Sequence, residues 1–314
     1  MNDLFQSTEY TSFLSDVGRS LHGMIEPFCV SLPRGDRKIG WINGDLQQDG
    51  NALKRFLSRR AIINGGAHLE SDITESELRS LLNLCISKLR HKAIYIETRN
   101  FKDYSHFRTA FEQCGFVYEP HYNFIVNTEA LETAESNLGK SRKRDIRTSL
   151  RDGASVIDNP DECQIKAFYS VLKNLYETRV KTPLFPVEFF LTLSKTTFSK
   201  FLLVQYNDQI IGGTVCVFDD EKVYEWFACG QDGVYKNIFP STLATWSGIR
   251  FAAESGHKYF DMMGAGAPGD GGYGVRDFKA KFGGKLVEYG RFKYICNPPL
   301  YKLGKLGVSL LKKI

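Results

Sequence analysis

Hydrophobic and polar positions in the first half of the chain predict alternating strands and helices. Residues 26–32 and 37–46 have the pattern of strands, and Pro33-Arg-Gly-Asp36 between them is typical of a turn. Thr74-Glu-Ser-Glu77 has the composition of a capping box, which predicts a helix through about Arg90. The other elements predicted here are strands at 61–63, 93–97 and 116–126 and a helix at 104–114. Alternation of this kind predicts an α/β domain.

The pattern begins again after a polar stretch at 129–136, which we interpret as a junction. A strongly basic helix is predicted at 138–152. The elements predicted after it are strand 155–157, helices 161–179 and 186–194, strands 201–206, 210–218 and 223–229, helix 240–254, strand 259–262, helix 275–282 and strand 286–294. We therefore expect one domain at 1–133, a second at 134–297 and a short tail at 298–314.

The tail has apolar residues at helical spacing between lysines. The apolar positions are Leu303, Leu306, Leu310 and Ile314, and the flanking cations are Lys302, Lys305, Lys312 and Lys313. This is the pattern of a short basic amphipathic helix, which either contacts a membrane surface peripherally or packs its leucines onto the domain.

Composition narrows the class of protein without identifying it. The chain has 314 residues, 42% hydrophobic and 25% charged, with a net charge of +5 that permits an anionic partner. The seven cysteines include no C-x-x-C pair, and the six histidines are isolated, so no metal site is expected. The polar N-terminus lacks the pattern of a signal peptide, and no run of about 18 apolar residues occurs. We expect a cytoplasmic protein, or one peripheral at the inner face of a membrane.

Three segments of the second half carry the most specific signal. Residues 236–246 (KNIFPSTLATW) contain a Pro-Ser helix start, and residues 258–264 (KYFDMMG) form an apolar strand that ends near Asp261. After a glycine-rich loop, residues 276–284 (RDFKAKFGG) predict a helix rich in Arg, Lys and Phe.

This order and spacing resemble the C-terminal half of the FemAB-like branch of the GNAT acyltransferases, the branch of the peptidoglycan interpeptide-bridge enzymes. Those proteins carry two GNAT-type domains in one chain and move an acyl or aminoacyl group onto an amine. The resemblance covers roughly residues 1–295. It implies an α/β fold of two tandem GNAT-like domains, with mixed sheets flanked by helices.

The resemblance also implies catalytic residues. Phe278-Lys279 and Phe282-Gly283 match the family's Phe-Lys…Phe-Gly helix, which places the pair beside the reacting ester. There the Lys279 ammonium would stabilise an oxyanion or protonate the leaving oxygen. As a surface lysine it is expected to contribute little to stability. Asp261 would orient or deprotonate the attacking amine, or else cap the following loop.

Several residues are candidates for binding the donor or substrate. Arg179 resembles a family position that meets substrate phosphates, although a cation there also complements a helix dipole. Lys236, Asn237 and Ser241 lie at a helix start that lacks the glycines of a conventional coenzyme A loop, and Ser241 or Asn237 is alternatively the helix cap. The remaining candidates are Arg144 of the basic helix, Tyr273 of the glycine-rich loop and Arg276; their alternatives are solvated charges and a loop aromatic.

The predicted function is an N-acyltransferase that moves an acyl group from an acyl thioester to an amine of a cell-envelope precursor. The first alternative is an aminoacyl-tRNA-dependent aminoacyltransferase of the peptidoglycan-bridge type. The second is a binding protein that kept the fold without the chemistry. Acyl-CoA or aminoacyl-tRNA would be a co-substrate, with no permanently bound cofactor. The acceptor would be a small-molecule or lipid-linked amine, tRNA is a partner in the first alternative, and no DNA partner is expected.

Overall fold

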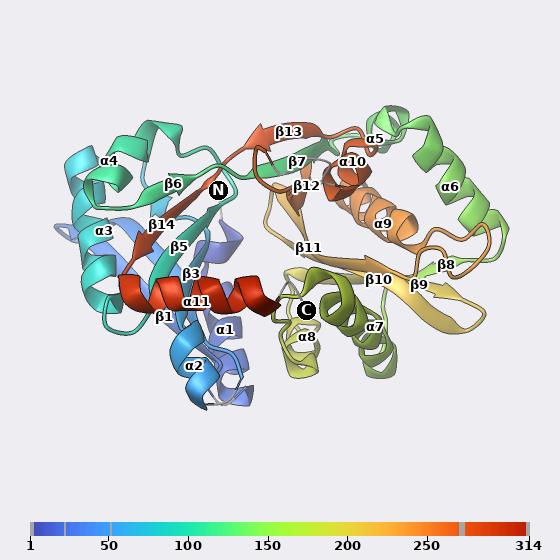
Figure 1. Ribbon diagram of the computed structural model, residues 1–314. Coiled ribbons are helices and arrows are strands. Elements are labelled where there is room, and N and C mark those ends of the chain that lie inside the picture. The colour runs from blue at the N-terminus through green and yellow to red at the C-terminus, as the bar shows by residue number, and fades with distance from the viewer. Residues whose placement is uncertain (1–2, 22, 51, 270–273, 312–314) are drawn as a thin grey trace. The chain divides into compact units, whose positions relative to one another are not determined.

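The computed structural model describes residues 3–311 except residues 22, 51 and 270–273 (Figure 1). Its strands form two seven-stranded mixed sheets, and the chain divides into two compact units. The C-terminal unit comprises residues 122–287. The N-terminal unit comprises the described residues of 3–121 together with 288–311. The predicted α/β class is confirmed.

The sheet of the N-terminal unit has the order β1-β2-β3-β5-β14-β6, with β4 beside β2. Strands β1 (Ile25–Arg34) and β2 (Arg37–Gln47) form the predicted antiparallel hairpin. Strand β3 (Arg60–Gly65) pairs antiparallel with β2 and parallel with β5 (Tyr95–Asn100). The other elements are η1 (Leu4–Gln6), α1 (Thr8–Ser20), α2 (Ala52–Ser58), β4 (His68–Leu69), α3 (Glu75–Leu89), η2 (Ser105–Phe107), α4 (Arg108–Gln113), β6 (Val117–Glu119), β14 (Arg291–Ile295) and α11 (Pro298–Leu311).

Helix α3 begins with the predicted capping box. The Glu77 N–H donates to Thr74 Oγ1 at 3.2 Å, and the Thr74 N–H donates to the Glu77 carboxylate at 2.9 Å. The apolar stripes of α3 and α4 share one core with the sheet, which includes Leu78, Leu81, Leu82, Phe111, Ile63, Ile96 and Phe292. These two helices therefore cover one face of this sheet.

The sheet of the C-terminal unit has the order β13-β7-β12-β11-β10-β9-β8. Strands β9 (Ser199–Tyr206), β10 (Gln209–Phe218) and β11 (Lys222–Gly230) form the predicted antiparallel meander. Strand β12 (Tyr259–Gly264) lies parallel to β11. The other elements are β7 (Tyr122–Asn127), α5 (Leu131–Asn137), α6 (Lys140–Arg151), β8 (Ser155–Ile157), α7 (Glu162–Leu175), η3 (Tyr176–Val180), α8 (Val187–Leu193), α9 (Pro240–Glu254), α10 (Gly274–Ala280) and β13 (Lys285–Glu288).

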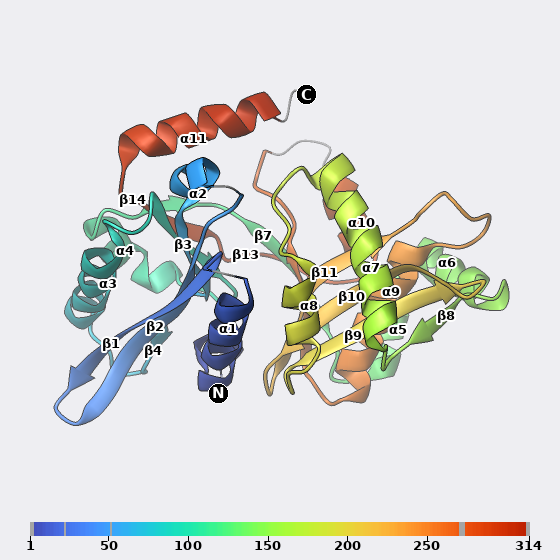
Figure 2. The same ribbon diagram turned by 90° about the horizontal axis from the view of Figure 1, so that it is seen from below.

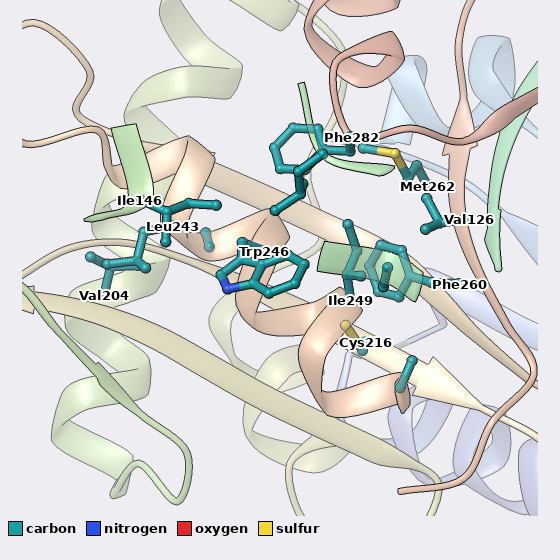
Figure 3. Close-up of a cluster of buried hydrophobic side chains, with 14 of the residues drawn as sticks. Val126, Ile146, Val204, Cys216, Leu243, Trp246, Ile249, Phe260, Met262 and Phe282 are labelled. Carbon is teal, nitrogen blue, oxygen red and sulfur yellow. The ribbon is translucent and has the colours of Figure 1, made fainter. Parts of the chain in front are cut away.

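Helices cover both faces of this sheet (Figure 2): α9 packs on one face and α7 with α8 on the other. The α9 side holds a continuous apolar core around Trp246, Ile249 and Phe260 (Figure 3). Phe282, directly after α10, and Ile146 of α6 complete this core. Packing of α9, α10 and β12 into one cluster fixes the positions of the segments that the sequence singled out.

The two sheets exchange one strand each. β6 and β7 follow one another in the chain, yet β6 pairs with β14 whereas β7 pairs with β12. Likewise β13 is a neighbour of β7, whereas β14 pairs with β5 and β6. In the N-terminal sheet the parallel pair β3 and β5 is followed by β14, from the second half of the chain, and then by the short strand β6. In the C-terminal sheet the parallel pair β11 and β12 is followed in the same way by β7, from the first half, and then by the short strand β13. This shared order makes the two halves structural repeats.

Because of this exchange, two segments that were each predicted as one strand form two strands. Segment 116–126 divides at Pro120, which lacks an N–H to continue a ladder, and segment 286–294 divides at Gly290. Gly290 has φ of 65°, and a Cβ there would lie 2.2 Å from the Tyr118 ring, so only glycine fits.

Three further features differ from the sequence-based picture. The polar stretch at 129–136 holds helix α5 rather than an irregular junction, and helices α1 and α2 were not predicted. Because β7 and β14 bond into opposite sheets, the chain passes from one compact unit to the other at 121/122 and again at 287/288.

The tail forms helix α11, which contacts α2 within the N-terminal unit. Tyr301 packs edge-on against Tyr95 with ring centroids 5.6 Å apart. Leu303 and Leu306 are instead 52% and 64% exposed, so these leucines do not pack onto the unit. The side chains at 307–311, and residues 312–314, lie outside the described part. In that part, no helix is long and apolar enough to cross a membrane.

Candidate active site

The pairing of the parallel strands β11 and β12 ends close to the segments that the sequence singled out. Their pairing runs from Lys222 opposite Tyr259 to Tyr224 opposite Asp261. The next residue of β11, Glu225, is almost completely buried, and its Oε1 accepts a hydrogen bond from Thr245 Oγ1 of α9 at 2.7 Å. A carboxylate therefore lies at the point where the two strands diverge.

The end of β12 is bent around Asp261. Met263 has φ of 55°, a left-handed conformation that is uncommon for a residue other than glycine. Asp261 Oδ1 accepts the Met263 N–H at 2.7 Å, and Asn123 Nδ2 of β7 donates to the same carboxylate at 3.0 and 3.2 Å. Asp261 is completely buried. These bonds hold the bend, so the geometry favours the capping interpretation of Asp261 over direct contact with an amine.

Lys279 of α10 binds the backbone of the same bend. Its Nζ donates to the carbonyl oxygens of Met262 and Gly264, the latter at 3.0 Å. Arg276 extends this contact: its Nε donates to Ala265 O at 3.1 Å and its Nη2 to Ala267 O at 2.7 Å. The ammonium is thus partly buried and anchored, and it is not the freely exposed surface lysine that the sequence suggested.

Glu225, Asp261 and Lys279 form an electrostatically coupled group. Burial lowers the pKa of Lys279, while the negative charges of Glu225 and Asp261 oppose that shift. Burial likewise raises the pKa of Glu225, and the Lys279 charge and the Thr245 hydrogen bond act in the opposite direction. Burial also raises the pKa of Asp261. Both carboxyl pKa values therefore lie above their usual range and the ammonium pKa lies below its own, as in many sites of proton transfer.

Phe278 supports α10 from the core side. The Arg142 guanidinium of α6 lies 4.3 Å from the centre of the Phe278 ring and 5.2 Å from that of Phe282. Arg142 also donates to Thr242 Oγ1 of α9 at 3.1 Å. This buried arginine joins α6, α9 and α10, which gives Phe278 a packing role next to Lys279.

The carboxylate of Asp232, an exposed residue, closes the start of α9. The Ser241 N–H donates to Asp232 Oδ1 at 3.2 Å, and the Phe239 N–H donates to Ser149 Oγ at 2.9 Å. Pro240 has no N–H. A Cβ on Gly230 would lie 2.4 Å from Ser241 N, so β11 approaches the helix start closely. These residues do not fit a pyrophosphate cradle of the kind that binds coenzyme A.

Neither predicted side chain caps α9, because the N-cap residue is Phe239. Asn237, with φ of 62°, instead donates from Nδ2 to Asp152 Oδ2 at 3.1 Å, which ties the loop to the end of α6. The neighbouring Lys236 is exposed.

The remaining predicted binding residues do not join the group around Lys279. Arg144 is exposed on α6, where it pairs with Asp145 at 2.9 Å. Arg179 is exposed in η3 at the end of α7. Tyr273 lies outside the described residues.

Sequence reasoning missed Glu225, Thr245 and Asn123. The available signal was Glu225 itself, a charged residue in the otherwise apolar run 223–229. A charge in such a run indicates either a bulge or a buried functional group, and here β11 does have a register shift, opposite Val215/Cys216. Thr245 and Asn123 carry no such local signal, because their importance depends on tertiary contacts.

Comparison with known proteins agrees with this architecture. The FemAB family model matches residues 192–307, which include β11, β12 and the Phe-Lys segment. No curated protein sequence matches the chain. Among solved structures, FemX has a TM-score of 0.70 at 15% identity, covering 96% of this chain and 94% of FemX.

Two further structures share the fold at low identity. L-PGS from Bacillus licheniformis has a TM-score of 0.59 at 13% identity, covering 96% of this chain and 92% of its own. The tandem GNAT protein from the clavulanic acid biosynthesis pathway has a TM-score of 0.53 at 10% identity, covering 95% and 97%. The fold is therefore that of two tandem GNAT-like domains, and the match over 192–307 confirms the resemblance of this chain to the FemAB-like branch of the GNAT acyltransferases.

Proposed function

We propose that this chain is an acyltransferase that moves an acyl or aminoacyl group from an activated ester or thioester onto an amine of a cell-envelope precursor. The observation that carries the proposal is the anchored ammonium of Lys279 beside Glu225, where β11 and β12 diverge. The FemAB match spans β11, β12 and α10, and FemX and L-PGS share the fold.

The reaction requires an attacking nitrogen and a stabilised oxyanion. The amine nitrogen forms a bond to the acyl carbon, and the carbonyl electron pair moves onto oxygen. Two of the Lys279 ammonium protons bind backbone carbonyls, which leaves one to stabilise that oxyanion. Glu225 accepts the proton of the attacking amine, a role for which its raised pKa is suited. The bond to the leaving oxygen or sulfur then breaks, and the leaving group takes up the proton that Glu225 accepted.

Asp261 acts as a positioning residue in this scheme. It bonds the Met263 N–H and Asn123 and thereby fixes the carbonyls that Lys279 binds. Its charge also contributes to keeping Lys279 protonated.

A second candidate specifies the donor as aminoacyl-tRNA. The observation that favours it is the Asp232 carboxylate at the start of α9, because a coenzyme A pyrophosphate at that helix start would meet a like charge. The exposed Arg144, Arg147 and Arg151 of α6 offer cations for a nucleic acid backbone. Arg179 and Lys236 remain proposed contacts for donor phosphates.

A panel of donors tests the proposal. The protein is incubated with labelled acetyl coenzyme A or labelled aminoacyl-tRNA, together with a lysine-containing pentapeptide or an amino sugar phosphate. We expect a mass increase on the amine with one donor class, and the aminoacyl-tRNA candidate requires that class to be the tRNA ester. No mass increase with any pair, from protein that binds the acceptor, would favour the non-catalytic binding protein.

We further propose that α11 contacts a membrane surface. Leu303 and Leu306 are exposed beside Lys302 and Lys305, a combination that suits anionic lipid headgroups. The protein should therefore sediment with vesicles containing phosphatidylglycerol at low salt, and Leu303→Ser with Leu306→Ser should reduce the bound fraction severalfold. A matched control is Leu84→Ser with Leu150→Ser, two leucines with similar exposure. Equal sedimentation of both double variants would contradict membrane contact through α11.

A further inference from the structure

One face of the N-terminal sheet carries charged residues on three adjacent strands. The strand register places Glu97 of β5 opposite Lys293 of β14, and Arg99 opposite Arg291. Arg291 also lies opposite Glu119 of β6. Residues that alternate with these, such as Ile96 and Phe292, belong to the core beneath α3 and α4. The charged side chains therefore occupy the face that those helices leave uncovered.

Three cations surround a single buried carboxylate on this face. The Glu97 carboxylate lies 2.9 Å from Arg99 Nε, 3.3 Å from Lys293 Nζ and 3.5 Å from Arg291 Nη1. Lys293 also pairs with Glu119 at 2.6 Å. The positive charges hold the pKa of Glu97 at about 2 although burial alone would raise it. Glu97 is thus ionised at neutral pH and acts as the fixed centre that holds the cations together.

The group keeps hydrogen-bond donors that its carboxylates do not use. Glu97 and Glu119 pair with the three cations. The buried Asp45 carboxyl, whose pKa burial raises to about 6, also interacts with Arg99. The Nε of Arg291 is buried and has no hydrogen-bond partner. Arg99 bonds Glu97 through Nε, and its side chain is 37% exposed against 6% for Glu97. Like charges held this close, with donors to spare, are typical of a site that an anion completes.

Neighbouring elements bound the charged face on two sides. Tyr301 of α11 packs on Tyr95, and the Lys293 ammonium lies 5.7 Å from the centre of the Tyr95 ring. On the other side, Asn64 Nδ2 donates to Tyr10 Oη at 3.3 Å. Between these contacts the guanidinium groups of Arg99 and Arg291 come from neighbouring strands, and a guanidinium fork matches the paired oxygens of a phosphate or carboxylate.

We propose that Arg99, Arg291 and Lys293 form a binding site for an oxyanion, a phosphate or carboxylate group, of the acceptor. The assignment to the acceptor rests on the proposed function, whereas anion binding by these residues does not. The site lies entirely within the N-terminal unit, separate in sequence from Lys279 and Glu225.

Calorimetric titration of the full chain with pyrophosphate and with citrate at low salt tests the site. We expect saturable binding of at least one probe, and the better probe distinguishes a phosphate from a carboxylate ligand. Arg99→Gln should weaken binding about 10-fold or more, because it removes one charged fork. Arg108→Gln, an exposed arginine of α4, is the matched control and should change nothing.

Three results would overturn the proposal. They are no binding of either probe by the native protein, an equal loss in Arg99→Gln and Arg108→Gln, or binding of an RNA oligonucleotide alone. Because binding is measured without turnover, a protein that binds pyrophosphate but transfers no acyl group would refute the proposed function and leave the anion site standing.

Discussion

Lys279→Met is expected to lower kcat/KM for acyl transfer by about 10²–10³-fold, the usual effect of losing one oxyanion donor. Methionine keeps the length of the side chain but removes the charge and the donors to Met262 and Gly264. Turnover of the amine acceptor by mass spectrometry, with the best donor of the panel, measures the loss.

The effect of Lys279→Met on stability is expected to be small, because two changes oppose each other. The substitution leaves two carbonyls without their donor, but it also removes a cation whose burial is unfavourable and lowers its pKa. The shift in melting temperature should therefore correspond to a change of no more than about 2 kcal/mol in the free energy of unfolding. Lys281→Met, an exposed lysine two residues further on, is the control and should keep full activity. Equal turnover by both variants would remove Lys279 from the mechanism.

Glu225→Gln should lower the rate by about 10²–10⁴-fold and change its dependence on pH. In the native protein the general base must be ionised, and burial raises the pKa of Glu225. The ordinary pKa of a glutamate is 4.5, so the acid limb of the kcat/KM profile should lie at a higher pH than that value. The residual activity of Glu225→Gln should lack this limb. Glu254→Gln, an exposed glutamate of α9, should keep both the rate and the limb.

Stability gives an independent check on Glu225. Because its folded-state pKa is raised, its contribution to the free energy of unfolding is full at low pH and is lost as the pH rises through that pKa. Glutamine remains neutral at every pH and can still accept from Thr245. The variant should therefore be at least as stable as the native protein at neutral pH. A clear drop in melting temperature there, with an unchanged pH profile of activity, would assign Glu225 a structural role instead.

The local pattern of the sequence predicted most elements but not the exchange of strands. The hairpin of β1 and β2, the capping box of α3 and the meander of β9 to β11 depend on neighbouring residues, so periodicity and turn chemistry reveal them. The division of segments 116–126 and 286–294 depends on which sheet each half joins. That choice is made by pairing partners far away in the chain, which no local pattern encodes.

The candidate site shows the same limit. The Phe-Lys motif indicated Lys279 and Phe278, and the end of a buried strand indicated Asp261. Whether Asp261 meets an amine or holds a bend depends on Asn123 and the Met263 N–H, which only the fold brings to it. The anchoring of Lys279 by two backbone carbonyls was equally beyond the sequence, because it depends on how α10 packs on β12.

In the proposed mechanism the acyl group reacts where β11 and β12 diverge, beside Lys279. The most direct measurement is photolabelling with an acyl donor that carries a diazirine in its acyl group, followed by peptide mapping. We expect labels within β11, β12 and α10, and we expect these labels to disappear when excess unlabelled donor is added before photolysis. Labels confined to other segments would contradict this location of the reaction. Labels within β11, β12 and α10 that excess unlabelled donor does not prevent would contradict it as well.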